Sequence, residues 1–242
     1  MSDVSLADRR EGGSRVQHAM QAVTDHIRVQ GLRVGDSLPG EAFFSASLGV
    51  SRPVMREAFG ALAALRLIDV GNGRKPRVAA MDGSVFATSL DHAISTAQIG
   101  VPDVWEVRRT IEQRTAALAA VQRSEAEAAG ILALAEAMAA SEADLEQLTD
   151  HDIAFHEAIA RASHNPLFVQ IVASFRHLMT VAVPAAWGTR VALTHRQLMI
   201  ERHRAVAAAI AAKDPVAAAA AMDDHFDTSI GDILKGMSDR KG

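Results

Sequence analysis

The feature that most constrains this chain is its second two-thirds, where apolar residues recur at helical spacing with hardly a break. After about Met81, glycine and strand-like runs nearly vanish, and alanine-rich segments continue to about Gly236. Alanine is the strongest helix former, and its small side chain lets helices approach closely. Because the expected loops are short, we predict an antiparallel helical bundle. The spacing predicts helices near residues 84–98, 102–121, 124–140, 144–163, 166–184, 190–212 and 214–235.

The first 80 residues follow a different pattern, with several turn signals and two short strand-like runs. Residues 1–13 are polar, contain a Gly-Gly pair and are predicted to be a disordered N-terminus. We expect an amphipathic helix from Ser14 to Gly31, then a turn-rich loop, a helix over 41–48 and a third helix ending near Leu65. The runs "RLIDV" and "PRVAA" are predicted to be strands around the tight turn of "GNGRK". The predicted order is helix, helix, turn, helix and a two-stranded wing.

Composition excludes several classes of protein and site. The 242 residues suit one large domain or two of ordinary size. Without cysteine there are no disulfides, thiolate metal sites or cysteine nucleophiles, so a transition-metal site must use His, Asp or Glu. No apolar run reaches membrane-spanning length, and the first residues lack the apolar core of a signal peptide, so we expect a cytoplasmic protein.

Charge is distributed unevenly along the chain. Residues 1–80 hold eleven Lys/Arg and eight Asp/Glu, a balance of +3. The remaining residues hold fourteen Lys/Arg and twenty-one Asp/Glu, a balance of −7. A basic first part and an acidic second part favour different partners for the two halves.

The helix that opens with "SRPVMREAF" has a basic front. Ser51 can cap this helix, and Pro53 is tolerated in its first turn. Arg52 and Arg56 lie opposite its apolar face, near a helix N-terminus that favours phosphate, and arginine can also grip guanine with two hydrogen bonds. The alternative is a solvated basic face. The preceding helix, the tight glycine turn and the basic hairpin favour DNA binding in the major groove. The apolar face consists of Met55, Ala58, Phe59, Leu62 and Leu65.

Residues 14–80 resemble the winged helix-turn-helix domain of the GntR family of bacterial transcription regulators. The shared features are G-D-S-L-P-x-E, L-G-V-S-R-x-x-x-R-E-A and a wing with glycine at its tip. Family members often carry arginine directly after the glutamate, where this chain has Ala42, so one contact to DNA does not carry over. The resemblance implies DNA contacts from the recognition helix and the wing tip by Ser51, Arg52, Pro53, Val54, Arg56, Asn72 and Gly73.

A second informative stretch is "LTDHDIAFHEAIARASHNPLF". On a helical wheel, Asp152 and His156 lie one turn apart within an otherwise apolar face. Burial of these two polar groups is costly unless a partner satisfies them, and a divalent metal would do so. His203 lies on the apolar side of its helix, and His225 flanks another apolar stripe. His164 and His177 are instead predicted to be surface residues.

The stretches "DIAFHEAI…HNP", "ERHRAVAAAI" and "AMDDH" resemble the FCD effector domain of the FadR subfamily of GntR regulators, which is an all-α bundle. The resemblance places this domain at residues 102–236, after a linker or first helix at 81–101 and before a tail at 237–242. Zinc is the first expectation for the metal that many members bind, and nickel, manganese and iron remain open. By position, the resemblance implies the ligands Asp152, His156, His203 and His225.

The resemblance also implies a binding site for an effector acid. In the family, an arginine at the position of Arg108 reaches into the pocket and pairs with the acid group. The alternative for this chain is an exposed Arg108–Glu112 ion pair. Trp187 in "VPAAWGT" matches a ligand-contacting position of members that respond to sugar acids, although it could equally pack at a helix end. His195 is kept as a reserve metal ligand or pocket residue.

These patterns predict a mainly α, ligand-responsive DNA-binding transcription regulator with no catalytic residues. We expect a homodimeric repressor that leaves near-palindromic operator DNA when a small carboxylate, such as a sugar acid, binds at the metal. One alternative is a metal-dependent hydrolase, with Glu157 beside the metal as general base. The other is a constitutive DNA-binding protein with a structural metal. The DNA-binding head favours the regulator over the enzyme.

Overall fold

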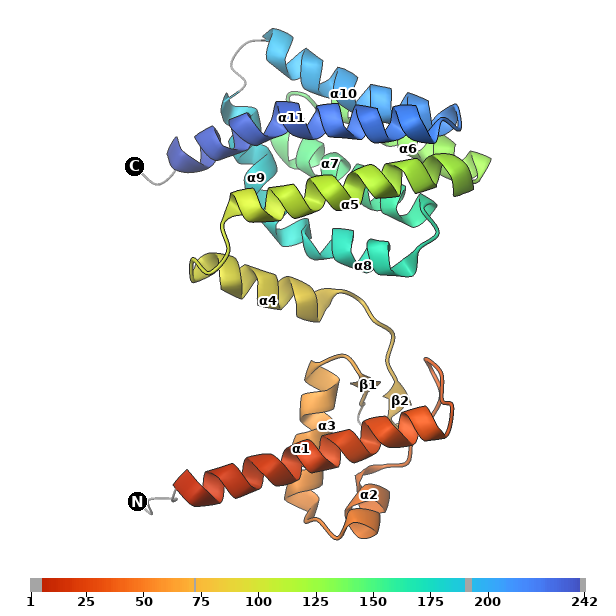
Figure 1. The fold of residues 1–242 in the computed structure, drawn as a ribbon, viewed down its shortest axis with the longest axis vertical. Coiled ribbons are helices and arrows are strands. Elements are labelled where there is room, and N and C mark those ends of the chain that lie inside the picture. Colours follow the sequence, from red (N-terminus) through yellow and green to blue (C-terminus); the bar gives the residue numbers. More distant parts are fainter. Residues whose placement is uncertain (1–5, 72, 190–192, 240–242) are drawn as a thin grey trace. The chain divides into compact units, whose positions relative to one another are not determined.

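The computed structural model describes residues 6–71, 73–189 and 193–239. The chain divides into two compact units, Met1–Val85 and Phe86–Gly242. Helices dominate both units, and the β structure of the described residues is one two-stranded sheet (Figure 1). The predicted mainly α class, with an N-terminal winged helix-turn-helix and a C-terminal helical bundle, is confirmed.

The N-terminal unit joins a helical core to a small wing. Gly49 ends α2 in the left-handed region at φ 65°, which turns the chain sharply into α3. The wing strands pair antiparallel, with Ile68 opposite Val78. Its elements are α1 (Leu6–Val29), α2 (Glu41–Leu48), α3 (Arg52–Ala64), β1 (Ile68–Asp69) and β2 (Arg77–Val78). Its core consists of Val16, Ala19, Val23, Leu38, Phe44, Met55, Ala58, Phe59, Leu62 and Ile68.

The first helix is longer than the sequence predicts. It begins at Leu6, so residues 6–13, which are predicted to be disordered, are helical. The Ala, Arg and Glu residues of "ADRRE" favour helix, which offsets the cost of about 1 kcal/mol for each of the two following glycines. The polar composition of this segment therefore does not exclude a helix.

The C-terminal unit is a bundle whose long helices pack through small side chains. α5 and α11 run side by side, α9 and α10 pack on α11, and α7 contacts both α5 and α6 (Figure 1). Ala116, Ala119, Ala207 and Ala218 are buried, so the alanine tracts form close helix contacts. Its helices are α4 (Ser84–Ser95), α5 (Val101–Gln122), α6 (Glu125–Ala140), α7 (Leu145–Ala162), α8 (Pro166–Ser174), α9 (Arg176–Thr189), α10 (Leu193–Ala211) and α11 (Pro215–Asp239).

The predicted single helix over 166–184 is wrong. The chain forms α8 and α9, which are bent by 54° at Phe175, and α9 continues through Pro184 to Thr189. The buried Phe175 donates its N–H to Val172 O, a short-range bond that tightens the end of α8. Proline inside a helix costs about 3 kcal/mol. Burial of the neighbouring residues 182, 183 and 185–187 offsets this cost.

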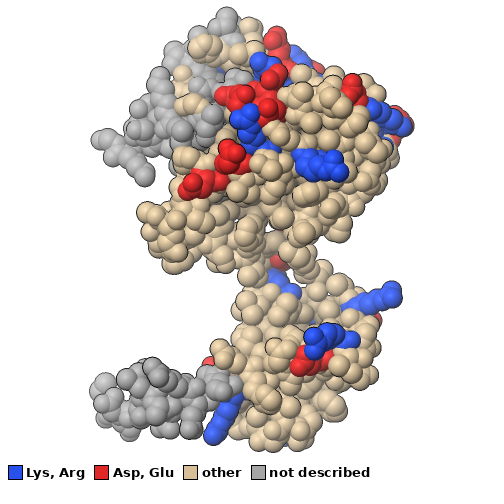
Figure 2. All heavy atoms as spheres, in the orientation of Figure 1, with Lys and Arg blue, Asp and Glu red and all other residues tan. Residues whose placement is uncertain are grey.

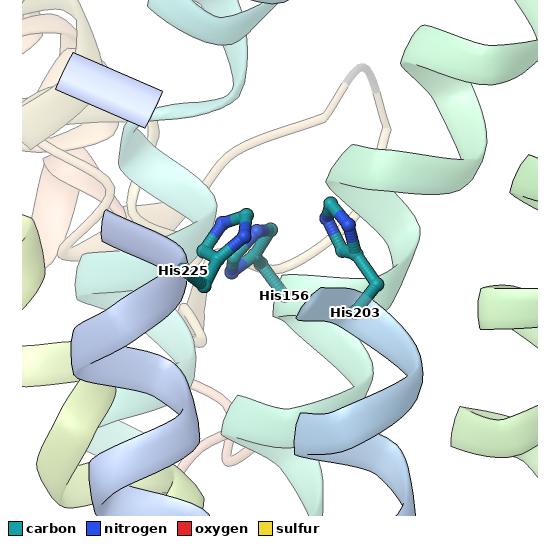
Figure 3. A group of neighbouring side chains, drawn as sticks. All are labelled: His156, His203 and His225. Atoms are coloured by element: carbon teal, nitrogen blue, oxygen red, sulfur yellow. The ribbon is translucent and has the colours of Figure 1, made fainter. Parts of the chain in front are cut away.

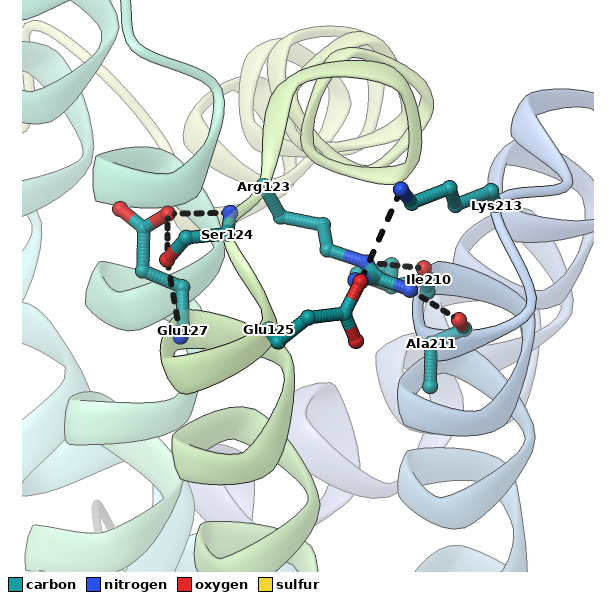
Figure 4. A network of polar contacts seen from close by, with 7 residues as sticks. All are labelled: Arg123, Ser124, Glu125, Glu127, Ile210, Ala211 and Lys213. Carbon is teal, nitrogen blue, oxygen red and sulfur yellow. Dashed lines mark hydrogen bonds and ion pairs between the residues drawn. The ribbon is translucent and has the colours of Figure 1, made fainter.

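A buried arginine joins the α5–α6 loop to the end of α10 (Figure 4). Arg123 is 7% exposed and donates to Ile210 O at 3.3 Å and to Ala211 O. These are terminal carbonyls of α10 that lack partners within the helix. Arg123 also pairs with Glu125. The loop therefore holds the C-terminal end of α10 in place.

Among the described residues, no single helix is both long enough and apolar enough to cross a bilayer. Only α8 and α9 taken together have the length and composition, and they are the bent pair described above.

Candidate metal centre and nucleic-acid interface

Three histidines from three different helices meet inside the C-terminal bundle. His156 comes from α7, His203 from α10 and His225 from α11, and all three are 5% exposed or less. Each offers one ligand atom, and these atoms lie within 4.8 Å of one another. Figure 3 shows the three rings gathered between their helices. Buried imidazoles at this separation can share one metal ion.

Asp152 extends this cluster along α7. It lies one turn before His156, is buried, and places Oδ1 at 3.0 Å from His203 Nε2. It falls outside the group of atoms within 4.8 Å, so it reaches the cluster through His203. The structure thus brings together all four residues that the sequence predicts as metal ligands.

The hydrogen bonds of His203 show that the site suits a cation. His203 Nδ1 lies 2.8 Å from Met199 O, and because a carbonyl only accepts, Nδ1 carries the proton. In the neutral ring, Nε2 then presents a lone pair to an ionised Asp152 oxygen, which is also an acceptor. Two facing acceptors need a metal ion or a second proton between them. The backbone bond at Nδ1 is also the usual way to orient a metal-binding imidazole.

The carboxyl of Asp152 stays ionised in this buried position. Burial by itself raises the pKa of Asp152, but the hydrogen bond with His203 and the electrostatic interactions with His156, His203 and Arg108 lower that pKa to about 2. A carboxylate that is ionised at neutral pH is the form that binds a metal.

Glu112 is a part of the site that the sequence reasoning did not place there. It lies on α5, is 1% exposed and contacts His156 Nδ1 through Oε2. Its other oxygen accepts a 2.7 Å bond from Arg108 Nε. Burial alone raises the pKa of Glu112, yet the charges of Arg108 and His156 lower it to about 2. With Nδ1 of His156 held by Glu112, Nε2 is the nitrogen left for a metal.

Arg108 is buried, so the alternative of an exposed Arg108–Glu112 pair is wrong in its exposure, although the pair itself is present. The guanidinium lies among aromatic rings, 4.9 Å from the centroid of Trp105, 5.8 Å from Phe175 and 5.4 Å from Phe226. Among the described residues, the hydrogen-bond acceptor of its Nη1 is a thioether, the sulfur of Met179, which is a weak acceptor. Arg108 therefore offers a donor that an anionic ligand would satisfy better.

The next residue, Arg109, has a different role. It faces away from the cavity and forms ion pairs with Asp223 and Asp227 of α11 at 2.5 Å each. The two adjacent arginines thus separate into a cavity residue and a surface residue, as their positions on the helical wheel predict.

A small cavity connects these groups. It is lined by Arg108, Asp152 and all three clustered histidines, together with Trp105 and Trp187. The space holds roughly two or three water molecules. Trp187 is buried in its wall. His195 is exposed and does not line the cavity, so the reserve role as a pocket residue finds no support.

The predicted surface histidines lie outside the centre. His177 is exposed, and so is His164, which lies 3.1 Å from Glu127. Glu157, the base that the hydrolase alternative needs, accepts bonds of 3.0 and 2.8 Å from Arg176. The same carboxylate also lies 3.5 Å from Arg161. The geometry therefore does not favour Glu157 as a general base.

The N-terminal unit presents the predicted DNA-binding residues at the front of α3. Ser51, Arg52, Pro53 and Arg56 are exposed, and Val54 is half-buried. Ser51 is the N-cap residue, but its side chain makes no capping hydrogen bond, so its hydroxyl is available at the surface. Arg56 is 3.8 Å from Glu41, a loose exposed contact.

The wing tip is described only in part. Gly73 is exposed with φ 71°, a conformation that favours glycine, whereas Asn72 lies outside the described residues. On the face drawn in Figure 2, Lys and Arg side chains stand out on the N-terminal unit, while charges of both signs lie close together on the C-terminal unit.

Comparison with known proteins agrees with this division. The family model for bacterial regulatory proteins of the gntR family matches residues 15–78, and the FCD domain model matches residues 103–228. The chain is similar to the HTH-type transcriptional regulator LutR of Bacillus subtilis, with 31% identity over 210 residues that cover 85% of this chain and 94% of LutR. It is also 34% identical, over 203 residues, to the Glc operon transcriptional activator of Escherichia coli K12, covering 81% of this chain and 80% of that protein.

Solved structures agree at the level of the fold. The structure of Streptococcus agalactiae GntR has a TM-score of 0.61 and 23% sequence identity, and the match covers 88% of this chain and 97% of that one. With two family models that together span most of its length and relatives above 30% identity, the chain belongs to the GntR family of bacterial transcription regulators, as a member with a C-terminal FCD domain.

Proposed function

We propose that this transcription regulator senses a small carboxylate at a buried metal centre and changes its affinity for operator DNA in response. The observation that carries the proposal is the convergence of three imidazoles and Asp152 on a cavity whose wall also contains Arg108. An open metal position and a guanidinium together would hold the two oxygens of a carboxylate.

The kinds of ligand atom at the centre limit which metal ions would bind there. Three imidazoles and one carboxylate suit zinc first, and nickel, manganese and iron(II) also accept such ligands. The metal would act as a Lewis acid that binds an acid oxygen. Asp152, His156, His203 and His225 would hold it, and Glu112 would orient His156.

The DNA-binding part of the proposal uses the exposed front of α3. Ser51, Arg52, Pro53, Val54 and Arg56 would enter the major groove, and the wing tip at Asn72 and Gly73 would reach the minor groove. Arginine side chains at a helix N-terminus support this docking, because both favour phosphate and base-edge contacts.

We further infer a cytoplasmic homodimer, since two heads related by a two-fold axis would match a near-palindromic operator. Among its relatives, one is named the Galactonate operon transcriptional repressor of Escherichia coli, with 29% identity over 159 residues. Galactonate is a sugar acid, which supports a carboxylate effector and a repressor released by it. The relative that is named an activator leaves activation as the second mode of control.

The test combines ligand binding and DNA binding in one preparation. The full chain, loaded with Zn²⁺, is titrated calorimetrically with a panel of small carboxylic acids. Its affinity for a DNA site selected from random sequence is then measured with and without each acid that binds. We expect one acid to shift DNA affinity about 5- to 150-fold. A protein that binds acids but keeps its DNA affinity would contradict control by ligand, and turnover of an acid would revive the enzyme alternative.

A further inference from the structure

The wing carries an arginine whose charge is not used inside the described part of the fold. Arg74 is exposed, and among the described residues its guanidinium has neither an ion pair nor a hydrogen bond. Other arginines of the N-terminal unit are engaged. Arg66 lies 3.1 Å from Asp82, and Arg77, on the same hairpin as Arg74, donates to Gly35 O at 2.6 Å. The side chain of Arg74 is therefore available to a partner outside the described fold.

A glycine makes room for this side chain. Arg74 closes the turn of the hairpin, where its backbone N–H donates to Gly71 O at 3.2 Å. Its guanidinium folds back over Gly71, so that a Cβ atom on residue 71 would lie 2.6 Å from Nη2 and 2.9 Å from Nε. Such distances are too short for any side chain at this position. Gly71 thus lets the guanidinium lie against the turn itself.

The turn at the end of the wing is also thin. Gly71 and Gly73 stand on either side of residue 72 and have no side chains, and Gly73 adopts a φ of 71°. The minor groove of B-DNA is only about 6 Å wide, so it admits a thin turn better than one with several bulky side chains. Among the described residues of 71–74, Arg74 alone has a long side chain.

Arginine has two properties that suit a narrow minor groove. Runs of A·T pairs narrow this groove and strengthen its negative potential, which attracts cationic side chains. A guanidinium is more weakly hydrated than the ammonium group of a lysine, so it loses less when it leaves water for the groove. The guanidinium against the turn therefore fits A·T-rich DNA better than the ammonium group of the neighbouring Lys75 does.

We propose that Arg74, held over Gly71, is a specificity residue that reads the width of the minor groove, so that the operator has A·T-rich segments where the wing docks. This inference rests on the docking of α3 and the wing proposed above. The preference needs no hydrogen bond that identifies a base, because the width and the potential of the groove themselves depend on sequence.

The test separates the minor groove from the major groove. The full chain is titrated with three duplexes that share one site selected from random sequence. They differ in the segments that flank the α3 contacts and are protected from hydroxyl radicals, which contain A·T, G·C or inosine·cytosine pairs. Inosine lacks the 2-amino group of guanine, so its pair with cytosine resembles G·C in the major groove and A·T in the minor groove. We expect the A·T and inosine duplexes to bind roughly tenfold tighter than the G·C duplex.

Three variants assign this preference to its residue. Arg74→Gln should bind all three duplexes with equal affinity. Arg28→Gln removes the same charge from the last turn of α1 and should keep the preference. Gly71→Ala keeps the charge of the wing but puts a Cβ atom where the guanidinium lies, so its preference should fall. The fold should tolerate this alanine, because the crowded atoms belong to the far end of a flexible side chain.

The outcomes separate this inference from the docking model. Equal binding of the three duplexes by the wild type, or a preference that survives in Arg74→Gln, would overturn the role of Arg74 and leave the docking of α3 standing. A preference for A·T over inosine pairs would place the readout in the major groove and also overturn it. A preference unchanged in Gly71→Ala would overturn the positioning by Gly71. If Arg56→Ala bound the selected site as tightly as the wild type, the docking through α3 would fail, and the inference with it.

Discussion

At the scale of single residues, the centre depends on a chain of buried charges that runs from Arg108 through Glu112 to His156. Neither Glu112 nor Arg108 is more than 2% exposed, so each charge is balanced by its neighbour rather than by water. Removal of one member leaves another buried charge without compensation. These contacts therefore link the arginine that we propose to bind the acid to an imidazole that we propose to bind the metal.

The first prediction concerns Glu112→Gln. Glutamine keeps the size of the side chain but loses the charge that orients His156 through Nδ1, so we expect metal affinity to fall about 10- to 100-fold. Competition with a chromophoric chelator measures this change. Glu106→Gln, at an exposed position of α5, is the matched control and should leave the affinity unaltered. Equal affinities of the two variants would show that Glu112 does not orient the ligand.

The second prediction uses the adjacent arginines. The Arg108→Gln variant should keep its bound metal and a hydrogen bond to Glu112. Its affinity for the effector acid should fall at least about tenfold, because a charge-assisted pair is lost. Arg109→Gln removes the same charge from the surface pair with Asp223 and Asp227, and acid binding should persist. Calorimetry on both metal-loaded variants measures the difference. If both bind the acid as the wild type does, its carboxylate lies elsewhere.

The sequence predicts some residues of the candidate metal centre and misses others. Asp152 and His156 stand out because they interrupt an apolar face at helical spacing. The structure brings them together with His203 and His225, although wheel positions alone do not give distances between helices. Glu112 and Trp105 were missed because a charged residue four positions from an arginine looks like a surface pair, and a tryptophan looks like core. The signal that could have found Glu112 is its position on the α5 face shared with Val104, Ala116 and Ala119.

At the scale of helices, the ends are held by specific side chains. Ser124 and Glu127 form a capping box at the start of α6, in which Glu127 Oε2 accepts from Ser124 N at 2.7 Å (Figure 4). Arg123, just before this cap, satisfies the last carbonyls of α10. The start of one helix is thus tied to the end of another.

Arg123→Met tests this connection. Ala211 O would lose the donor that Arg123 supplies, and Ile210 O would keep the N–H of Lys213, so we expect the free energy of unfolding to fall by about 1–3 kcal/mol. Urea unfolding followed by tryptophan fluorescence is the measurement, because Trp105 and Trp187 both belong to the C-terminal unit. Arg114→Met, at an exposed position of α5, is the control. An equal stability of the two variants would assign no capping role to Arg123.

The front of α3 carries the fourth prediction. Arg56→Ala should weaken specific DNA binding and reduce the slope of log affinity against log salt by about one unit. Arg28→Ala removes the same charge from the last turn of α1 and should preserve specific binding. Gel shifts at several salt concentrations compare the two. Indistinguishable behaviour would mean that α3 does not dock on DNA through this residue.

Helix positions were mostly predictable, and the exceptions have physical causes. The 3.6-residue period locates the amphipathic helices, but it predicts a helix end at Pro184, whereas tertiary burial carries α9 through this proline. The break at Phe175 has no glycine or proline to announce it. The sequence does not predict the extension of α1 to Leu6, because a polar composition is shared by disordered segments and exposed helices.

At the scale of the whole molecule, two units with separate cores share one chain. The proposed metal ligands all belong to the C-terminal unit and come from three helices that are far apart in sequence. A metal that binds the folded state alone stabilises it by an amount that grows with the logarithm of the metal concentration. Its effect should therefore be confined to one of the two units.

Scanning calorimetry tests this fifth prediction. Zn²⁺ at a hundred times its dissociation constant should stabilise the C-terminal unit by about 2.7 kcal/mol, and a chelator should reverse the effect. The transition of the N-terminal unit should stay at the same temperature. His156→Ala should lose the response. If Zn²⁺ still raised the unfolding temperature of the C-terminal unit in this variant, His156 would not be a metal ligand.

The bond between His203 Nδ1 and Met199 O has one more consequence. The imidazole takes its orientation from a carbonyl four residues earlier on its own helix, so the aim of Nε2 depends on that turn of α10 being wound. Unwinding there would swing the ring away and release the ion. Occupancy of the proposed metal site would thus report whether α10 is intact, and a bound ion would in turn resist fraying of that turn.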